Sequence, residues 1–144
     1  MPSSITMYHQ YTKPRPASSP LTLVLFEDPH WLPSVKSQLE TLTALPKGWD
    51  AMGSPPVRSD IAEFAMNYLL PKIMKDHTPA PNLVPVSGGG LQIEWHRNQV
   101  DVELFVSGQF ETEFYFQDLG TGLIVEEELV ANFLILEQYI SRLA

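Results

Sequence analysis

The chain contains no cysteine and no long apolar run. Without cysteine it has no disulfides, no thiolate metal ligands and no cysteine nucleophile. None of its apolar runs approaches the roughly 20 residues needed to cross a bilayer. The first ten residues lack the basic-then-apolar pattern of a secretory signal. We therefore expect a cytoplasmic protein with no membrane partner.

Positive charge is scarce in the second part of the sequence. The net charge is −8; residues 1–90 hold seven Lys/Arg and seven Asp/Glu, whereas residues 91–144 hold two Lys/Arg and ten Asp/Glu. A nucleic-acid-binding domain normally carries a basic stripe, and this chain shows the reverse. The charge pattern argues against direct binding of nucleic acid and favours a basic protein partner.

Length and composition predict one domain with its own core. The chain has 144 residues, of which 44% are hydrophobic. Residues 1–20 are rich in Pro, Ser and Thr without periodicity, which predicts a flexible N-terminal tail. Residues 21–144 then form a single domain, and its first apolar run, 21–26, predicts a short strand.

Three helices are predicted from apolar spacing. The first spans about 33–44. The second begins at Asp60, which would act as N-cap with Glu63 completing a capping box, and Pro71 ends or kinks it. The third spans about 126–143, and its three leading glutamates suit the positive end of the helix dipole.

Residues 91–116 contain three segments in which apolar and polar residues alternate. A period of two places the apolar side chains on one face of a sheet. A two-residue turn at 97–98 and a three-residue loop at 107–109 would join these strands. Further strands are expected at 83–86 and 123–125. The pattern predicts an α+β fold, an antiparallel β-meander of three to five strands with about three helices packed on its apolar face.

The polar face of this meander is acidic. It would carry five carboxylates, two aromatic rings and no Lys or Arg, and these are the candidate partner-binding residues: Glu94, Asp101, Glu103, Phe105, Glu111, Glu113 and Tyr115. The predicted turns place Glu94 opposite Asp101 and Glu103 opposite Glu113, which are destabilising like-charge pairs. Two interpretations stay open: a merely solvated face, or a binding patch for a Lys/Arg-rich surface around an aromatic anchor.

The loop containing Trp49 and Asp50 is a secondary candidate. In the structural interpretation Trp49 plugs the edge of the core and Asp50 caps a turn. In the functional interpretation the loop presents both side chains to a partner. The run Ser87–Gly90 precedes a strand and lacks the Lys-Ser/Thr of a phosphate-binding loop, so it predicts a turn.

Catalytic and metal-binding motifs are lacking in the sequence. The four histidines show no metal-ligand spacing, and no G-x-S-x-G nucleophile motif occurs. We therefore expect a non-enzymatic protein with no cofactor and no metal. Two alternatives remain: a small-molecule- or metal-dependent enzyme using Glu94, Glu103 and Glu113 with His96, and a structural homodimer formed through the sheet face or the last helix.

Several short motifs resemble a loosely defined group of small bacterial and phage proteins of unassigned function. They are Leu45-Pro-Lys-Gly-Trp-Asp50, Ser54-Pro-Pro56, the helix after Asp60, Pro79-Ala-Pro81, and Gly89-Gly-Leu-Gln-Ile-Glu-Trp95 followed by Val102-Glu-Leu. They cover somewhat under half of the chain, Ala51 stands where that group has Gly, and the N-terminal segment is extra. The resemblance implies a cytoplasmic accessory or defence-related role in a bacterium or phage-infected cell, such as an antitoxin, an immunity protein or a phage inhibitor of the anti-CRISPR kind. The leading hypothesis is an inhibitor-like protein whose acidic sheet face engages a basic partner.

Overall fold

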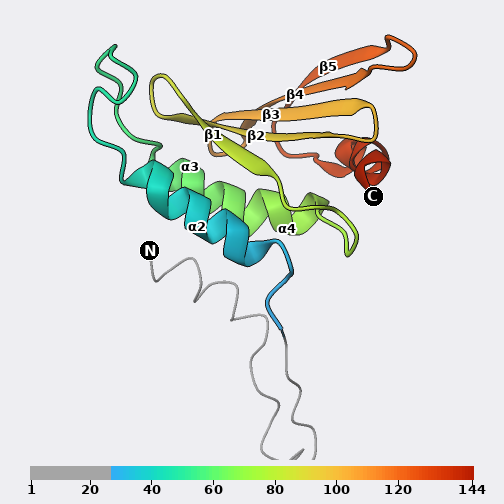
Figure 1. Ribbon diagram of the computed structural model, residues 1–144, viewed down its shortest axis with the longest axis horizontal. Coiled ribbons are helices and arrows are strands. Elements are labelled where there is room, and N and C mark those ends of the chain that lie inside the picture. Colours follow the sequence, from blue (N-terminus) through green and yellow to red (C-terminus); the bar gives the residue numbers. More distant parts are fainter. Residues whose placement is uncertain (1–26) are drawn as a thin grey trace, which may run out of the picture.

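The fold is a five-stranded antiparallel sheet with helices on one face (Figure 1). The computed structural model describes residues 27–144, so the expectations for 1–20 and 21–26 lie outside the described residues. Strand order in space follows strand order in sequence, β1-β2-β3-β4-β5, which is a meander. The predicted α+β fold is confirmed. No helix in the described range has the length and apolar character to cross a membrane.

The strands are β1 (Asn82–Val86), β2 (Gly90–Arg97), β3 (Val100–Gly108), β4 (Glu111–Asp118) and β5 (Ile124–Leu129). Burial alternates along β2, β3 and β4. The apolar face therefore forms the core, as the period of two predicts, and includes Leu91, Ile93, Val102, Leu104 and Phe116.

Three helical segments cover this apolar face, two before the sheet in the sequence and one at the C-terminal end (Figure 1). Helix α2 (Leu32–Thr43) matches the predicted helix, and its buried stripe packs in the core. The second segment is continuous through α3 (Ser59–Phe64), the π-helical turn η2 (Ala65–Leu69) and α4 (Leu70–Ile73). A proline ring clashes with the carbonyl four residues earlier, and the wide π turn precedes Pro71, where it relieves that clash. Pro71 thus distorts this helix without ending it.

The predicted capping box at Asp60 is wrong. The helix begins at Ser59 with Arg58 as N-cap, and no side chain caps the helix there. The Asp60 carboxylate instead pairs with the Arg58 guanidinium at 2.7 Å. Asp60 therefore sits in the first turn, where a negative charge also suits the helix dipole.

The predicted helix over 126–143 is wrong in its first part. Residues 124–129 form β5, and helical turns follow as η3 (Leu134–Leu136), α5 (Glu137–Ile140) and η4 (Ser141–Leu143). In β5, Val125 pairs with Phe116 and Leu129 pairs with Thr112. The ladder with β4 pairs the inward backbone groups of this segment and overrides its local helix preference.

The predicted β2–β3 turn is also wrong. The two turn residues are Asn98 and Gln99, with φ angles of 54° and 60°, which suit a tight hairpin turn. The pairing is consequently Glu94 with Glu103 and His96 with Asp101, rather than Glu94 with Asp101. The predicted faces survive because a displacement of two residues keeps the alternation in phase.

The predicted three-residue loop at 107–109 does not form, because Gly108 pairs with Glu111 and the turn lies between them. The packing of Phe110 explains the difference. Phe110 lies in the turn with a φ of 59°, and the register shifts between Val106 and Gly108. Its ring packs edge-on against Phe64 and Tyr68, with centroid distances of 5.0 Å and 4.8 Å. As a result Glu103 pairs with Tyr115 and Phe105 pairs with Glu113, so the predicted Glu103–Glu113 pair does not form.

Candidate partner-binding face

The face of the sheet that carries no helices is acidic across four strands. We call its side chains the acidic face: Gln92, Glu94, His96, Asp101, Glu103, Phe105, Glu111, Glu113, Tyr115, Gln117, Ile124, Glu126 and Glu128. All seven residues predicted from the sequence lie on it. No lysine or arginine occupies an open-face position of the five described strands.

Two of its carboxylates were missed by the sequence prediction. Glu126 pairs with Tyr115 and Glu128 pairs with Glu113, so β5 extends the face by two acids. The two residues of β5 that pack on the core, Val125 and Leu129, are four residues apart, a spacing that helices and strands share. Glu127 breaks the alternation that would have identified a strand.

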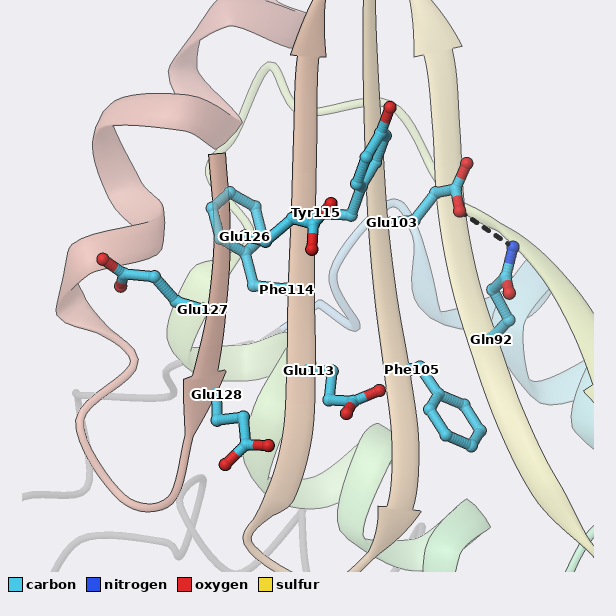
Figure 2. A pocket seen from close by; sticks show the side chains of 9 residues that line it. All are labelled: Gln92, Glu103, Phe105, Glu113, Phe114, Tyr115, Glu126, Glu127 and Glu128. Carbon is cyan, nitrogen blue, oxygen red and sulfur yellow. Dashed lines mark hydrogen bonds between the residues drawn. The ribbon is translucent and has the colours of Figure 1, made fainter. Parts of the chain in front are cut away.

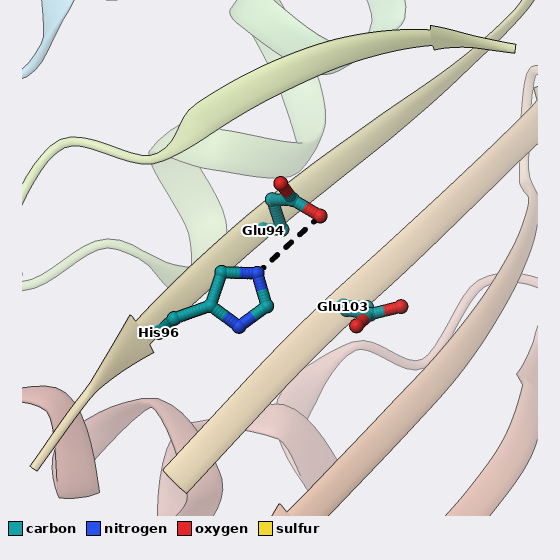
Figure 3. A group of neighbouring side chains, drawn as sticks. All are labelled: Glu94, His96 and Glu103. Atoms are coloured by element: carbon teal, nitrogen blue, oxygen red, sulfur yellow. Dashed lines mark ion pairs between the residues drawn. The ribbon is translucent and has the colours of Figure 1, made fainter. Parts of the chain in front are cut away.

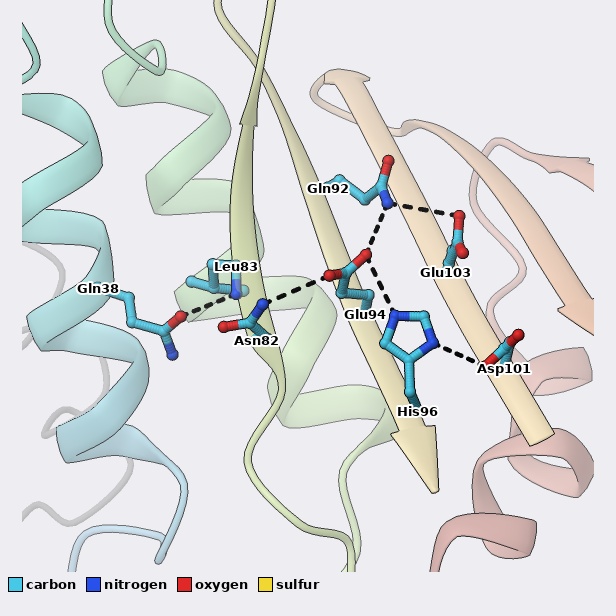
Figure 4. Close-up of polar contacts among 8 residues, drawn as sticks. All are labelled: Gln38, Asn82, Leu83, Gln92, Glu94, His96, Asp101 and Glu103. Carbon is cyan, nitrogen blue, oxygen red and sulfur yellow. Dashed lines mark hydrogen bonds and ion pairs between the residues drawn. The ribbon is translucent and has the colours of Figure 1, made fainter. Parts of the chain in front are cut away.

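The β2–β3 half of the face is a closed polar network (Figure 4). Glu94 and Glu103 lie opposite each other. The Gln92 side-chain amide donates to Glu94 Oε2 at 2.8 Å and to Glu103 Oε1 at 3.4 Å. Asn82 donates to the other oxygen of Glu94 at 3.4 Å. These amide donors offset the repulsion between the two carboxylates.

His96 completes this network. Its Nδ1 lies 2.7 Å from Asp101 Oδ1, and its Nε2 lies 3.5 Å from Glu94 Oε2. The hydrogen bond to Asp101 is the largest cause that raises the pKa of His96 above its ordinary 6.5, and Glu94 adds to it. Both carboxylates thus stabilise the imidazolium form, which, once His96 is protonated, offsets part of the negative charge on this half of the face.

Glu94, His96 and Glu103 also form the only cluster in the described residues that could hold a metal ion (Figure 3). One ligand atom from each lies within 4.8 Å of the others. Imidazole and carboxylate together suit Zn²⁺ or Mn²⁺. Glu113, which the enzyme hypothesis grouped with these residues, pairs with Phe105 on the next strands and is not part of the cluster.

The β4–β5 half of the face is a hollow of about 480 Å³ (Figure 2). Its walls include Glu103 and Phe105 of β3, Glu113 and Tyr115 of β4, and Glu126 and Glu128 of β5. Glu113 and Glu128 lie directly opposite each other. Unlike Glu94 and Glu103, they receive no hydrogen bond or ion pair from any side chain in residues 27–144. This half therefore carries like charges without internal compensation.

The two rings predicted as anchors lie on the open side of the sheet. Phe105 and Tyr115 are both half-buried, and no described helix covers them. The Phe105 ring lies over Gly90, where a Cβ would come within 2.9 Å of ring atom Cε1. The Tyr115 hydroxyl donates to Gln117 Oε1 at 2.8 Å. The rings are thus held in place beside the acids.

The loop of Trp49 and Asp50 has a structural role. The Asp50 carboxylate accepts hydrogen bonds from the Ser54 hydroxyl at 2.5 Å and the Ser87 hydroxyl at 2.6 Å. Trp49 Nε1 donates to the Pro55 carbonyl at 2.8 Å. The hydrogen bonds from Ser54 and then Ser87 hold the pKa of Asp50 well below its usual range. This loop is tied to the turn before β2, and its presentation to a partner stays a prediction.

No family model, no curated protein and no solved structure matches the chain. The fold and the face together define the class: an α+β meander protein with helices on one side of its sheet and an open, acidic second side.

Proposed function

We propose that the chain is a non-enzymatic protein-binding protein whose acidic face engages a basic surface of another protein. The observation that carries the proposal is the uncompensated β4–β5 half, where Glu113 and Glu128 stand opposite each other beside Phe105 and Tyr115. Like charges across a ladder destabilise the free protein. A partner's Lys and Arg would relieve that repulsion, and the aromatic rings would supply buried contact area.

In its sharpest form the protein is an inhibitor or antitoxin that occupies a basic, nucleic-acid-binding surface of its partner. Carboxylates and phosphates compete for the same guanidinium and ammonium groups. The resemblance of the motifs to small bacterial and phage proteins supports this form, and so does the concentration of negative charge after residue 90. A field of one sign also accelerates association with a partner of opposite charge.

The test compares three baits in affinity purification from the organism that encodes the chain, followed by mass spectrometry. The baits are the wild type, the face variant Glu113→Lys/Glu128→Lys, and the matched control Glu40→Lys/Asp76→Lys. Both variants change the charge by the same amount, but Glu40 and Asp76 are exposed residues away from the sheet. We expect a basic protein that the wild type and the control retain and the face variant loses, with purified components giving the same order in calorimetry. Equal retention by all three folded baits would overturn the proposal.

The second candidate is a divalent-cation-dependent protein using Glu94, His96 and Glu103. The convergence of their ligand atoms supports it. Its test is thermal melting with and without Zn²⁺, Mn²⁺ and Mg²⁺, because a ligand specific for the native state raises the melting temperature. An increase that disappears in Glu103→Gln would favour this candidate. A third candidate, the homodimer, is tested by light scattering over a dilution series.

A further inference from the structure

The two edges of the sheet differ in their capacity to pair. At the β1 edge, the Gln38 side chain of α2 makes the two backbone hydrogen bonds that a neighbouring strand would make. Its Nε2 donates to the Pro81 carbonyl at 3.1 Å, and its Oε1 accepts the Leu83 N–H at 2.8 Å. Pro85 has no N–H at the next outward position. The β1 edge is therefore closed to another strand.

The β5 edge has no such protection in the described chain. Asp118 N–H donates to the Leu123 carbonyl at 2.9 Å, which fixes the phase of the β4–β5 ladder. Hydrogen-bonded pairs recur every second residue in an antiparallel ladder. The backbone N–H and C=O groups of Val125, Glu127 and Leu129 therefore point toward β4. The backbone N–H and C=O groups of Ile124, Glu126 and Glu128 consequently point outward, and no group in residues 27–144 hydrogen-bonds to them.

An independent contact supports this phase. Leu119 N–H donates to the Gln99 carbonyl at 2.9 Å. The backbone groups of Leu119 and of every second residue before it therefore point toward β3. The backbone groups of the remaining β4 residues, including Phe114 and Phe116, then point toward β5. These are the residues that pair with Glu127 and Val125.

The charges on β5 select what can pair with it. Its three glutamates are exposed, with Glu126 and Glu128 on the acidic face and Glu127 on the opposite side. A second copy adding through the same strand would set glutamates against glutamates, which is unfavourable. An extended segment bearing Lys or Arg on alternate residues would place its cations beside Glu126 and Glu128.

We propose that β5 accepts an extended Lys/Arg-rich segment of the partner as a sixth strand of the sheet. The inference rests on the proposed function, because it takes the basic partner as given. It adds where the backbone of that partner binds. Main-chain hydrogen bonds to Ile124, Glu126 and Glu128 provide affinity, and the carboxylates provide selectivity for basic side chains. Ile124 and Val130, 51% and 70% exposed, add apolar contacts at the two ends.

The first test uses a matched pair of variants, Glu126→Pro and Glu126→Thr, in the full chain. Both remove the same carboxylate, but only proline removes the outward N–H, and an outer edge tolerates proline. The probe is an acetylated and amidated peptide of alternating lysine and threonine, seven residues long. We expect Glu126→Pro to bind about tenfold more weakly than Glu126→Thr, since one edge hydrogen bond and close approach are lost. Equal affinity of the two variants would overturn the inference. The pair Glu128→Pro and Glu128→Thr replaces the first pair if Glu126→Pro fails to fold.

The second test uses the wild-type chain and two forms of the probe, one of them N-methylated on the backbone edge that would face β5. Amide hydrogen exchange measured by NMR should slow at Glu126 and Glu128 with the first form, and the second form should bind at least about tenfold more weakly. Absence of binding by the first form would overturn the inference, as would equal affinity of both. NMR chemical-shift changes on adding the peptide that are confined to Phe105, Glu113 and Tyr115 would overturn the inference while leaving the proposed function in place. A dimer that Glu126→Pro converts to a monomer would make the occupant a second copy, which also overturns it.

Discussion

Glu94 and Glu103 lie directly opposite each other on β2 and β3, and one amide, that of Gln92, donates to both. Two adjacent carboxylates are tolerated there because a neutral donor lies between them. The pair Glu113 and Glu128 has no donor of this kind among the described residues. The two halves of the acidic face therefore differ in stability and in what they offer a partner.

Removing the shared donor should destabilise the fold. We expect Gln92→Leu to lower the free energy of unfolding by about 1–2 kcal/mol, because the charged acceptors Glu94 and Glu103 lose the amide that donates to both. Urea denaturation measures the effect. In the double variant with Glu103→Gln most of the loss should disappear, since one of the two charges is gone. A full, additive loss would show that the bridge does not offset their repulsion.

Relieving the uncompensated pair should do the opposite. We expect Glu128→Gln to stabilise the protein by about 0.2–1 kcal/mol, because its cross-strand partner Glu113 no longer faces a like charge. The gain should shrink in high salt, which screens exposed charges. The same variant should weaken partner binding. Thermal melting at low and high salt provides the measurement, and a destabilised Glu128→Gln would contradict the assignment.

The titration of His96 should depend on both of its acidic neighbours. We expect an NMR pKa above 6.5, lowered more by Asp101→Asn than by Glu94→Gln, because Asp101 is the larger cause of the shift. A raised folded-state pKa stabilises the fold fully below the unfolded value and loses that contribution as pH rises through the folded value. The stability difference between wild type and His96→Gln should therefore diminish from pH 6 toward pH 9. A difference that grows with pH would reverse the sign of this linkage.

The Asp50 carboxylate should stabilise the loop only while it is ionised. Its pKa is lowered by hydrogen bonds from Ser54 and Ser87, so its contribution is present above the ordinary value of 3.8 and lost as pH falls below it. We expect Asp50→Asn to melt at a lower temperature than the wild type at pH 7. The gap should narrow near pH 3 as the wild-type carboxylate approaches its folded-state pKa. Ser87→Ala is the matched control, since it removes one donor and leaves the carboxylate in place.

The parts of the fold that follow local patterns were predicted well. Helix α2 and strand β1 lie within about one residue of the predicted bounds, and the alternation placed all seven candidate residues on one face. The cross-strand pairs were wrong because they depend on which residues adopt positive φ in the turns. At Phe110 that choice follows packing against Phe64 and Tyr68, which are more than 40 residues away in sequence.

The sequence by itself determined that this protein has an acidic sheet face, because a period of two assigns side chains to faces whatever the register. It also determined where the charge lies, since ten of its acids follow residue 90. Only the tertiary structure decided that residues 124–129 form β5, because their backbone groups find partners on β4. That pairing sets Glu128 opposite Glu113 and leaves β5 as an open edge of the sheet. The local pattern around Glu126 encodes neither feature, because both depend on where β4 lies.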